Sequence, residues 1–206
     1  SPLCIAENGG EIHYSTRVED IIVANGAVKG VRCSNGAEYL ADSVVLATGH
    51  SARDIYHLLE RKGIALEAKG FAIGVRAEHP QRLIDKIQYH GQATEYLPAA
   101  SYSLVSQVDG RGVYSFCMCP GGFIVPSATE REQIVVNGMS SSQRNSPYAN
   151  SGIVVEMHPD DLPEEYKKYG ALSGLRFQQD VEHLAYVNNG GGLQTAPAQR
   201  LADFVK

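Results

Sequence analysis

The stretch Val44-Val-Leu-Ala-Thr-Gly-His-Ser-Ala-Arg-Asp54 decides the expected fold. Its first four residues are apolar without alternation, which favours a short strand buried on both faces. Thr48-Gly49 predicts a glycine turn after that strand, and Ser51 with Asp54 forms a capping-box pattern ahead of a helix. A strand that leads into a helix N-terminus presents backbone N–H groups to an anionic or phosphate-bearing ligand. The alternative is an ordinary β-α connection that binds nothing.

The composition excludes several classes of partner. The net charge is -5, from 18 Lys and Arg against 23 Asp and Glu, and no dense basic run occurs, which argues against a nucleic-acid partner. The longest apolar runs are far shorter than the roughly 20 residues that cross a bilayer, so we expect no membrane association. Four scattered cysteines do not form the pattern of a secreted disulfide scaffold, so we expect a cytoplasmic protein.

The first 70 residues predict a β-meander followed by the buried strand and its helix. Asn25-Gly26 and Asn35-Gly36 each separate β-prone runs, and Asn-Gly favours the type I′ hairpin turn. Gly63 is expected to end the helix as its C′ residue. The predicted strands are residues 11–14, 17–24, 27–33 and 37–40.

The rest of the chain predicts a β-rich lobe with flanking helices. Pro80 suits the first position of a helix whose Leu83, Ile84 and Ile87 would face inward. Residues 140–150 are polar and aperiodic, which indicates a long loop. Together with the meander, these patterns predict an α+β (mixed α/β) fold. The predicted strands here are residues 71–78, 102–108, 112–117, 123–125, 133–137 and 152–157, and the later helices are residues 175–187 and 198–204.

The stretch Cys117-Met-Cys119-Pro-Gly-Gly122 has the most unusual composition in the chain. Two thiols one residue apart could be redox-active or form half of a metal site. Along a strand they would face the same side, into one pocket or into the core. The alternative is two reduced cysteines packed as small apolar groups. Because no second pair of ligands has suitable spacing, we predict no metal site.

Other candidate site residues lie beside turns. Arg76 and Arg144, like Arg53 and Arg200, neighbour turns rich in Gly, His or Gln, where a guanidinium could hold a carboxylate or phosphate. A solvated arginine is the alternative for each. His50 follows the glycine turn and could contact a ligand there. His79 precedes Pro80 and could cap the next helix.

Several blocks taken together resemble a family of bacterial FAD-dependent dehydrogenase-like proteins, flavoproteins of the type with two dinucleotide-binding domains. The resemblance extends from about Gly9 to Phe204. The blocks are Gly9-Gly-Glu-Ile-His13, the stretch 44–54, Phe71-Ala-Ile-Gly-Val-Arg-Ala-Glu-His-Pro80, Phe116-Cys-Met-Cys-Pro-Gly-Gly122, Asn137-Gly-Met-Ser140 and Ala196-Pro-Ala-Gln-Arg200.

The resemblance implies a cofactor site and a domain division. It places Ala47, Thr48 and Gly49 against FAD, with His50 and Ser51 next in line. The family's G-x-G-x-x-G loop, which holds the FAD pyrophosphate, is absent from this sequence. The chain therefore resembles a middle section, in which residues 1–70 are a partial FAD-binding domain. Residues 71–206 would be a substrate-type domain whose last helix leads back to the FAD domain.

Two functional hypotheses follow. In the first, the chain is a fragment of an FAD-dependent oxidoreductase acting on a small molecule, inactive alone and binding FAD weakly or not at all. NAD(P)H is a possible electron donor, and the missing FAD-domain segments of the parent chain are partners. Arg76, Cys117, Cys119 and Arg144 would line the substrate pocket. In the second, the chain is a non-catalytic module in which residues 49–51 and the polar loop bind a small ligand or a partner.

Overall fold

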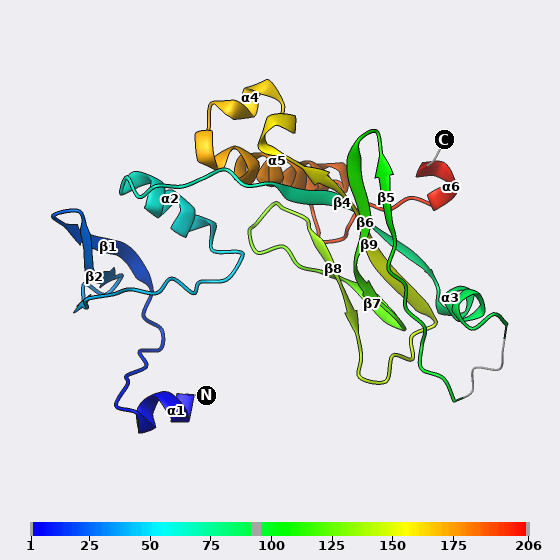
Figure 1. Cartoon of the computed structure of the whole chain (residues 1–206), viewed down its shortest axis with the longest axis horizontal. Helices are drawn as coiled ribbons and strands as arrows, with labels where there is room; N and C mark the ends of the chain where they lie inside the picture. Colours follow the sequence, from blue (N-terminus) through cyan, green and yellow to red (C-terminus); the bar gives the residue numbers. More distant parts are fainter. Residues whose placement is uncertain (1, 92–95, 205–206) are drawn as a thin grey trace. The chain divides into compact units, whose positions relative to one another are not determined.

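The computed structural model describes residues 2–91 and 96–204, which form two compact units (Figure 1). Unit one is Ser1–Leu66 and unit two is Glu67–Lys206. Helices and antiparallel sheets are mixed along the chain, so the predicted α+β class is confirmed. The roles of an FAD domain and a substrate domain, with a boundary at residue 70, stay predictions.

Unit one contains the expected three-stranded antiparallel meander, in the order β1-β2-β3. Both central residues of the first turn have positive φ, 54° at Asn25 and 74° at Gly26, which is the type I′ conformation that Asn-Gly predicts. Ile21 and Cys33 are buried within the meander. The strands are β1 (Val18–Ala24), β2 (Ala27–Cys33) and β3 (Glu38–Leu40), and a short helix α1 (Pro2–Glu7) precedes them.

The second turn of the meander differs from the prediction. Only Gly36 has a positive φ, of 81°. Asn35 instead uses its side-chain Oδ1 to accept a hydrogen bond from the backbone N–H of Ala37, at 3.0 Å. The backbone N–H of Cys33 donates to Ala37 O, so three residues separate the paired ends and only the last is left-handed. The type I′ prediction is wrong at this turn because the loop is one residue longer.

Residues 44–47 do not form the predicted buried strand. They have no regular secondary structure, and Val45 is 87% exposed. A strand needs a neighbour for its N–H and C=O groups, and the described residues of unit one provide no strand beyond the short meander. Residues 11–14 likewise form no strand. The predicted buried strand is therefore wrong, because an apolar run is buried only where another surface packs against it.

Helix α2 (Arg53–Arg61) forms as expected, but its start differs from the predicted capping box. The N-cap is Ala52, with no side-chain hydrogen bond. The hydroxyl of Ser51 is hydrogen-bonded to His50 Nδ1 at 2.7 Å. Asp54 accepts a hydrogen bond from Arg17 Nη2 at 2.6 Å, which lowers the pKa of its carboxyl group. Asp54 therefore pairs first with Arg17, and backbone N–H groups of the first turn of α2, at Asp54 and Ile55, also lower its pKa.

The end of α2 confirms the role predicted for Gly63. Gly63 has φ 67° and donates its N–H to Glu60 O at 2.9 Å. The next N–H, of Ile64, reaches Leu59 O at 3.0 Å. These two bonds define a Schellman motif, which satisfies the last carbonyl groups of the helix.

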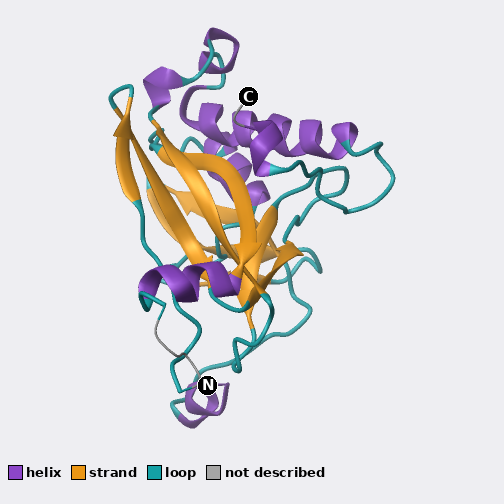
Figure 2. Ribbon diagram, turned by 90° about the vertical axis from the view of Figure 1, so that its right-hand side faces the viewer, coloured by secondary structure: helices purple, strands orange, loops and turns teal. Residues whose placement is uncertain are grey.

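Unit two is built on a four-stranded antiparallel sheet in the order β4-β9-β6-β5, and its twisted strands are seen in Figure 2. A second, two-stranded sheet β7-β8 contacts β6 and β9. The first half of β9 is the most deeply buried part, since Ala149, Asn150 and Ser151 have no exposed surface. The strands are β4 (Phe71–Pro80), β5 (Val105–Val108), β6 (Arg111–Cys119), β7 (Gly122–Pro126), β8 (Val136–Ser140) and β9 (Tyr148–Met157).

Most strand predictions for this unit are confirmed with shifted ends. The expected strand at residues 133–137 begins only at Val136. The expected loop at residues 140–150 is shorter, because its ends belong to β8 and β9.

The helices of unit two bury less apolar surface than their patterns predict. Pro80 is the N-cap of α3 and not its first residue, and of the three apolar residues expected inward only Ile84 is buried. Phe177 of α5 packs near Phe71 of β4, with ring centroids 6.4 Å apart. The helices are α3 (Gln81–Gln88), η1 (Pro159–Asp161), α4 (Glu164–Lys167), η2 (Gly170–Leu172), α5 (Ser173–Asn188) and α6 (Leu201–Phe204). None of the described helices has the length and apolar character of a membrane span.

Candidate functional site

Arg76 joins three other strands of unit two. Its Nη1 donates to Asn150 Oδ1 on β9 at 2.6 Å and to the carbonyl oxygen of Cys117 on β6 at 3.2 Å. Its Nη2 donates to Asn137 Oδ1 on β8 at 3.3 Å. Arg76 itself lies on β4, so one guanidinium connects the main sheet with the β7-β8 sheet. We call Arg76, Asn137 and Asn150 the Arg76 cluster.

The charge of Arg76 is not balanced by an acid. In the described part of the chain, Arg76 makes no ion pair, and all its acceptors are neutral oxygens. Other arginines of this unit are paired, Arg111 with Asp161 at 2.8 Å and Arg176 with Asp180 at 2.9 Å. A partly buried charge without a counter-ion costs solvation energy, so its presence indicates a functional role.

The backbone of β6 is distorted where it meets Arg76. Cys117 has φ 46°, unusual for a residue other than glycine, and the pairing of β6 with β9 is interrupted between Phe116 and Cys119. This bulge turns the Cys117 carbonyl toward both Arg76 and the Cys119 thiol, whose Sγ lies 3.3 Å from that oxygen. Backbone strain of this kind gathers at functional sites.

The bulge also changes what was expected of the two thiols. Regular alternation would place Cys117 and Cys119 on one face of the strand, and the bulge interrupts that alternation. The Cys117 side chain is exposed, so its packing as a buried apolar group is wrong, while Cys119 is half-buried. Both cysteines are free thiols. Their redox role stays a hypothesis.

The Pro-Gly-Gly turn after Cys119 is tightly enclosed. Gly121 has φ 50°, and a Cβ there would collide with the carbonyl group of Arg144. The Gly121 N–H donates to Gln81 Oε1 at 2.7 Å, and the Ser140 hydroxyl donates to Pro120 O at 2.7 Å. Arg144 therefore reaches the turn through its backbone. Within the described residues, its side chain makes no hydrogen bond or ion pair.

Gln81, which the sequence did not single out, anchors this turn. Its side chain is 6% exposed and donates from Nε2 to Asp85 Oδ1 at 2.8 Å and to Ala100 O at 2.9 Å. Asp85 Oδ1 also accepts the Ala100 N–H at 2.9 Å. Every polar atom of the Gln81 amide group is thus engaged in a bond that fixes a loop or helix beside the site.

His79, on β4 three residues beyond Arg76, forms a second polar pair with Tyr102 of the segment before β5. His79 Nε2 is hydrogen-bonded to the Tyr102 hydroxyl at 2.8 Å, and its Nδ1 is buried without a partner among the described residues. Burial lowers the pKa of His79 and raises the pKa of Tyr102. His79 was expected to cap a helix, but it belongs to β4 and Pro80 is the N-cap, so that expectation is wrong.

The stability of unit two is expected to fall in mild acid because of His79. Burial lowers the pKa of His79 in the folded state, so the unfolded state binds the proton more readily. The stabilising contribution of neutral His79 is complete above about pH 6.5 and is lost as pH falls toward the folded pKa. Urea denaturation followed through the NMR signals of β9 measures this effect. In His79→Gln the decline should be smaller, and parallel pH curves for the two proteins would contradict the prediction.

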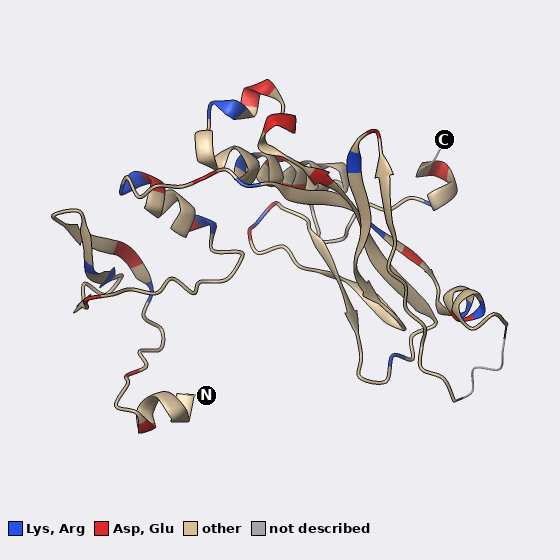
Figure 3. Ribbon diagram, in the orientation of Figure 1, with Lys and Arg blue, Asp and Glu red and all other residues tan. Residues whose placement is uncertain are grey.

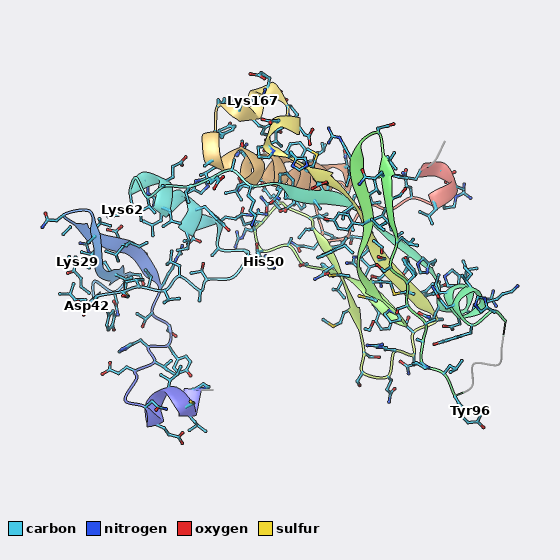
Figure 4. All side chains as sticks on the ribbon, in the orientation of Figure 1. Lys29, Asp42, His50, Lys62, Tyr96 and Lys167 are labelled. Carbon is cyan, nitrogen blue, oxygen red and sulfur yellow. The ribbon has the colours of Figure 1, made fainter. Side chains whose placement is uncertain are left out.

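The residues expected to contact a cofactor form no enclosed site within unit one. Ala47, Thr48, Gly49 and His50 are exposed, and Ser51 is half-buried. Gly49 has φ 76°, and a Cβ at this position would meet no atom within 4 Å. Figure 4 marks His50 on the loop before α2. Their contact with FAD stays a prediction.

Charged residues of both signs are dispersed along the ribbon (Figure 3). No group of three or more His, Cys, Asp or Glu side chains in the described residues has a geometry suited to a metal ion. The absence of nucleic-acid and membrane partners stays a prediction.

Comparison with known proteins gives the class to which this fold and site belong. The family described as FAD-dependent protein, C-terminal domain-like matches residues 70–206, most of the chain. The chain therefore belongs to this family of FAD-dependent proteins. The predicted resemblance is confirmed at this level, and its dehydrogenase-like type stays a prediction.

Two relatives are both much longer than this chain. A protein of Clostridium beijerinckii described only as uncharacterized is 43% identical over 201 residues, which are 96% of this chain and 37% of that protein. A 4,4'-diapophytoene desaturase (4,4'-diapolycopene-forming) of Methylomonas is 52% identical over 42 residues, 20% of this chain and 8% of the desaturase. The chain thus spans little more than a third of the length of the Clostridium beijerinckii protein.

Three of the four predicted pocket residues come together in the structure, namely Arg76, Cys117 and Cys119. Arg144 joins only through its backbone. The residues that sequence reasoning missed are Asn137, Asn150 and Gln81. A usable signal existed for the first two, because asparagine is depleted in strands and each lies in a β-prone run.

Proposed function

We propose that this chain is part of an FAD-dependent oxidoreductase in which unit two forms the substrate side of the active site. FAD would supply the hydride or electron transfer, and the protein would bind and orient the substrate. A small molecule is the expected substrate, with NAD(P)H as a candidate electron donor. Bleaching of the flavin by NADH or NADPH without oxygen, in a longer protein that contains this chain, would identify the donor.

The observation that supports the proposal most strongly is the arrangement around Arg76. Three of the four residues predicted as pocket walls, Arg76, Cys117 and Cys119, converge at one bulge of β6, and the Arg76 guanidinium lacks a counter-ion. This cluster lies within the segment matched by the FAD-dependent family. The Arg76 cluster, with Cys117 and Cys119, would thus face the substrate.

Unit one would contribute part of the cofactor site. Ala47, Thr48 and Gly49 would lie against FAD, with His50 and Ser51 beside them. The exposure of residues 45–50 and the open space at Gly49 leave room for a ligand or for a further chain segment. Because the chain has no G-x-G-x-x-G loop, we expect it to bind FAD weakly or not at all without the remaining segments.

Gly49→Ala tests the cofactor contact. In this chain the added methyl group meets open space, so the expected cost is only the left-handed φ, about 1 kcal/mol. In the longer protein the methyl group would press against FAD, and we expect FAD affinity to fall by about tenfold or more, which is roughly 1.4 kcal/mol. Fluorescence titration of the flavin-free longer protein measures this affinity.

Gly63→Ala is the matched control for this experiment. Gly63 has a similar φ of 67°, and a Cβ there also meets open space, but it lies at the far end of α2. It should leave FAD affinity unchanged. Equal loss of affinity in both variants would mean that Gly49 acts through folding, and it would contradict a contact between Gly49 and the cofactor.

A further inference from the structure

We infer that the Arg76 cluster binds a carboxylate group of the substrate. The inference rests on the proposed function only in assigning that carboxylate to the substrate of an FAD-dependent enzyme. Its evidence is the set of hydrogen-bond donors that the cluster leaves free.

One edge of the Arg76 guanidinium is available. Nη1 uses both of its hydrogens, toward Asn150 and the Cys117 carbonyl, and Nη2 uses one toward Asn137. This leaves Nε–H and one Nη2–H with no partner among the described residues. Nε has no partner and is not among the buried unpaired nitrogens of the described chain, so it is open to solvent. A carboxylate accepts two parallel hydrogen bonds from two adjacent N–H groups of an arginine.

The two asparagines add donors and no acceptors. Asn150 Oδ1 and Asn137 Oδ1 both face Arg76, and a guanidinium can only donate, so the orientation of each amide group is fixed. Asn137 Oδ1 also accepts the N–H of Gly138 at 2.8 Å. What remains of each side chain is an NH₂ group. The cluster is therefore rich in donors, which suits an anionic ligand.

Asn150 provides an independent sign of a missing acceptor. Its side chain is fully buried, and its Nδ2 has no hydrogen-bond partner within the described chain. A buried donor left unpaired is rare and costly in native proteins. An anion at the guanidinium, directly or through a bound water, would supply the acceptor.

Close packing keeps the cluster in place. A Cβ at Gly138 of β8 would collide with Arg76 Nη1, Asn150 Oδ1 and Cys119 Sγ, so all three atoms pack directly against the backbone of Gly138. Glu78, which shares this face of β4 by strand alternation, makes no ion pair with Arg76 in the described structure. An external carboxylate is thus the counter-ion that this geometry lacks.

The test is an NMR titration of this ¹⁵N-labelled chain with acetate and succinate at constant ionic strength. Acetamide, the neutral analogue of acetate, is the ligand control, and inorganic phosphate is the competing anion. We expect saturable shifts of the Arg76 Nε–H and Asn150 Nδ2 signals with a Kd on the order of 1 to 10 mM. Acetamide should give no saturation, and phosphate should bind more weakly than succinate.

Three variants locate the binding. Arg76→Gln should weaken acetate binding by about tenfold or more. Asn137→Asp should do the same, because it places a carboxylate beside Arg76 Nη2, and residue 137 is exposed enough for the change to be accommodated. Arg82→Gln removes the same charge from an exposed position on α3 and should leave binding unchanged.

Several results would overturn the inference. These are no saturable shift, equal shifts with acetamide, equal weakening by Arg82→Gln, or tighter binding of phosphate than of either carboxylate. In the first case Arg76 is a structural cross-link only. If the longer protein holds flavin but this chain does not bind acetate, only this inference is overturned. If this chain binds acetate but the longer protein holds no flavin, only the proposed function is overturned.

Discussion

Gly121→Ala is expected to lower the free energy of unfolding of unit two by at least about 3 kcal/mol. Two effects add, because Gly121 has φ 50° and its Cβ would collide with the backbone carbonyl of Arg144. Relief would require the turn to move away from residue 144, which would break the Gly121 N–H bond to Gln81. Urea denaturation followed through the NMR signals of β9 measures the loss.

Gly170→Ala separates the two effects. Gly170 has a similar φ of 54°, but a Cβ there meets open space, so only the conformational cost of about 1 kcal/mol is expected. If both variants lose the same amount, the close approach of residues 121 and 144 does not contribute. That result would remove the argument that Arg144 is held at the site by its backbone.

Gly74→Ala is expected to cost about 2 to 4 kcal/mol, by forcing β4 away from β9. Gly74 is paired with Val154, and an added Cβ would collide with the carbonyl of Ile153. Because Arg76 is two residues along β4, the Asn150 side-chain NMR signals should move together with the loss of stability.

Gly112→Ala is the control for Gly74 in the same sheet. A Cβ there would first meet the flexible end of Glu156, which can move, so a change within about 1 kcal/mol is expected. Equal costs at the two positions would contradict the close contact of β4 and β9 on which the Arg76 cluster depends.

Local sequence signals predicted local structure well. Asn25-Gly26 gave its turn type and Gly63 its helix end, because a positive φ is a property of the residue itself. Asn35-Gly36 has the same residues as the first turn but a longer loop, and the pairing of β2 with β3 decides its conformation. The strand pairing that sets loop length cannot be read from the dipeptide.

Sequence patterns whose structure depends on packing against a distant segment predicted the fold and the site wrongly or only in part. Residues 44–47 are apolar, but without a neighbouring strand they form no regular structure, and residues 45–47 are exposed. Its position near a turn predicts Arg76 as a site residue, but Asn150, 74 residues away, is the partner that defines its environment. Such long-range contacts follow from sheet register, so they appear only once β4 and β9 are aligned.

The most direct test of the account is the flavin content of two purified proteins, this chain and the longer protein that contains it. Visible absorbance and the FAD released on denaturation should give about one FAD per longer chain, the occupancy expected of a tightly held flavin. The chain alone should hold almost none. A longer protein that holds no FAD, even after incubation with excess cofactor, would contradict the central claim.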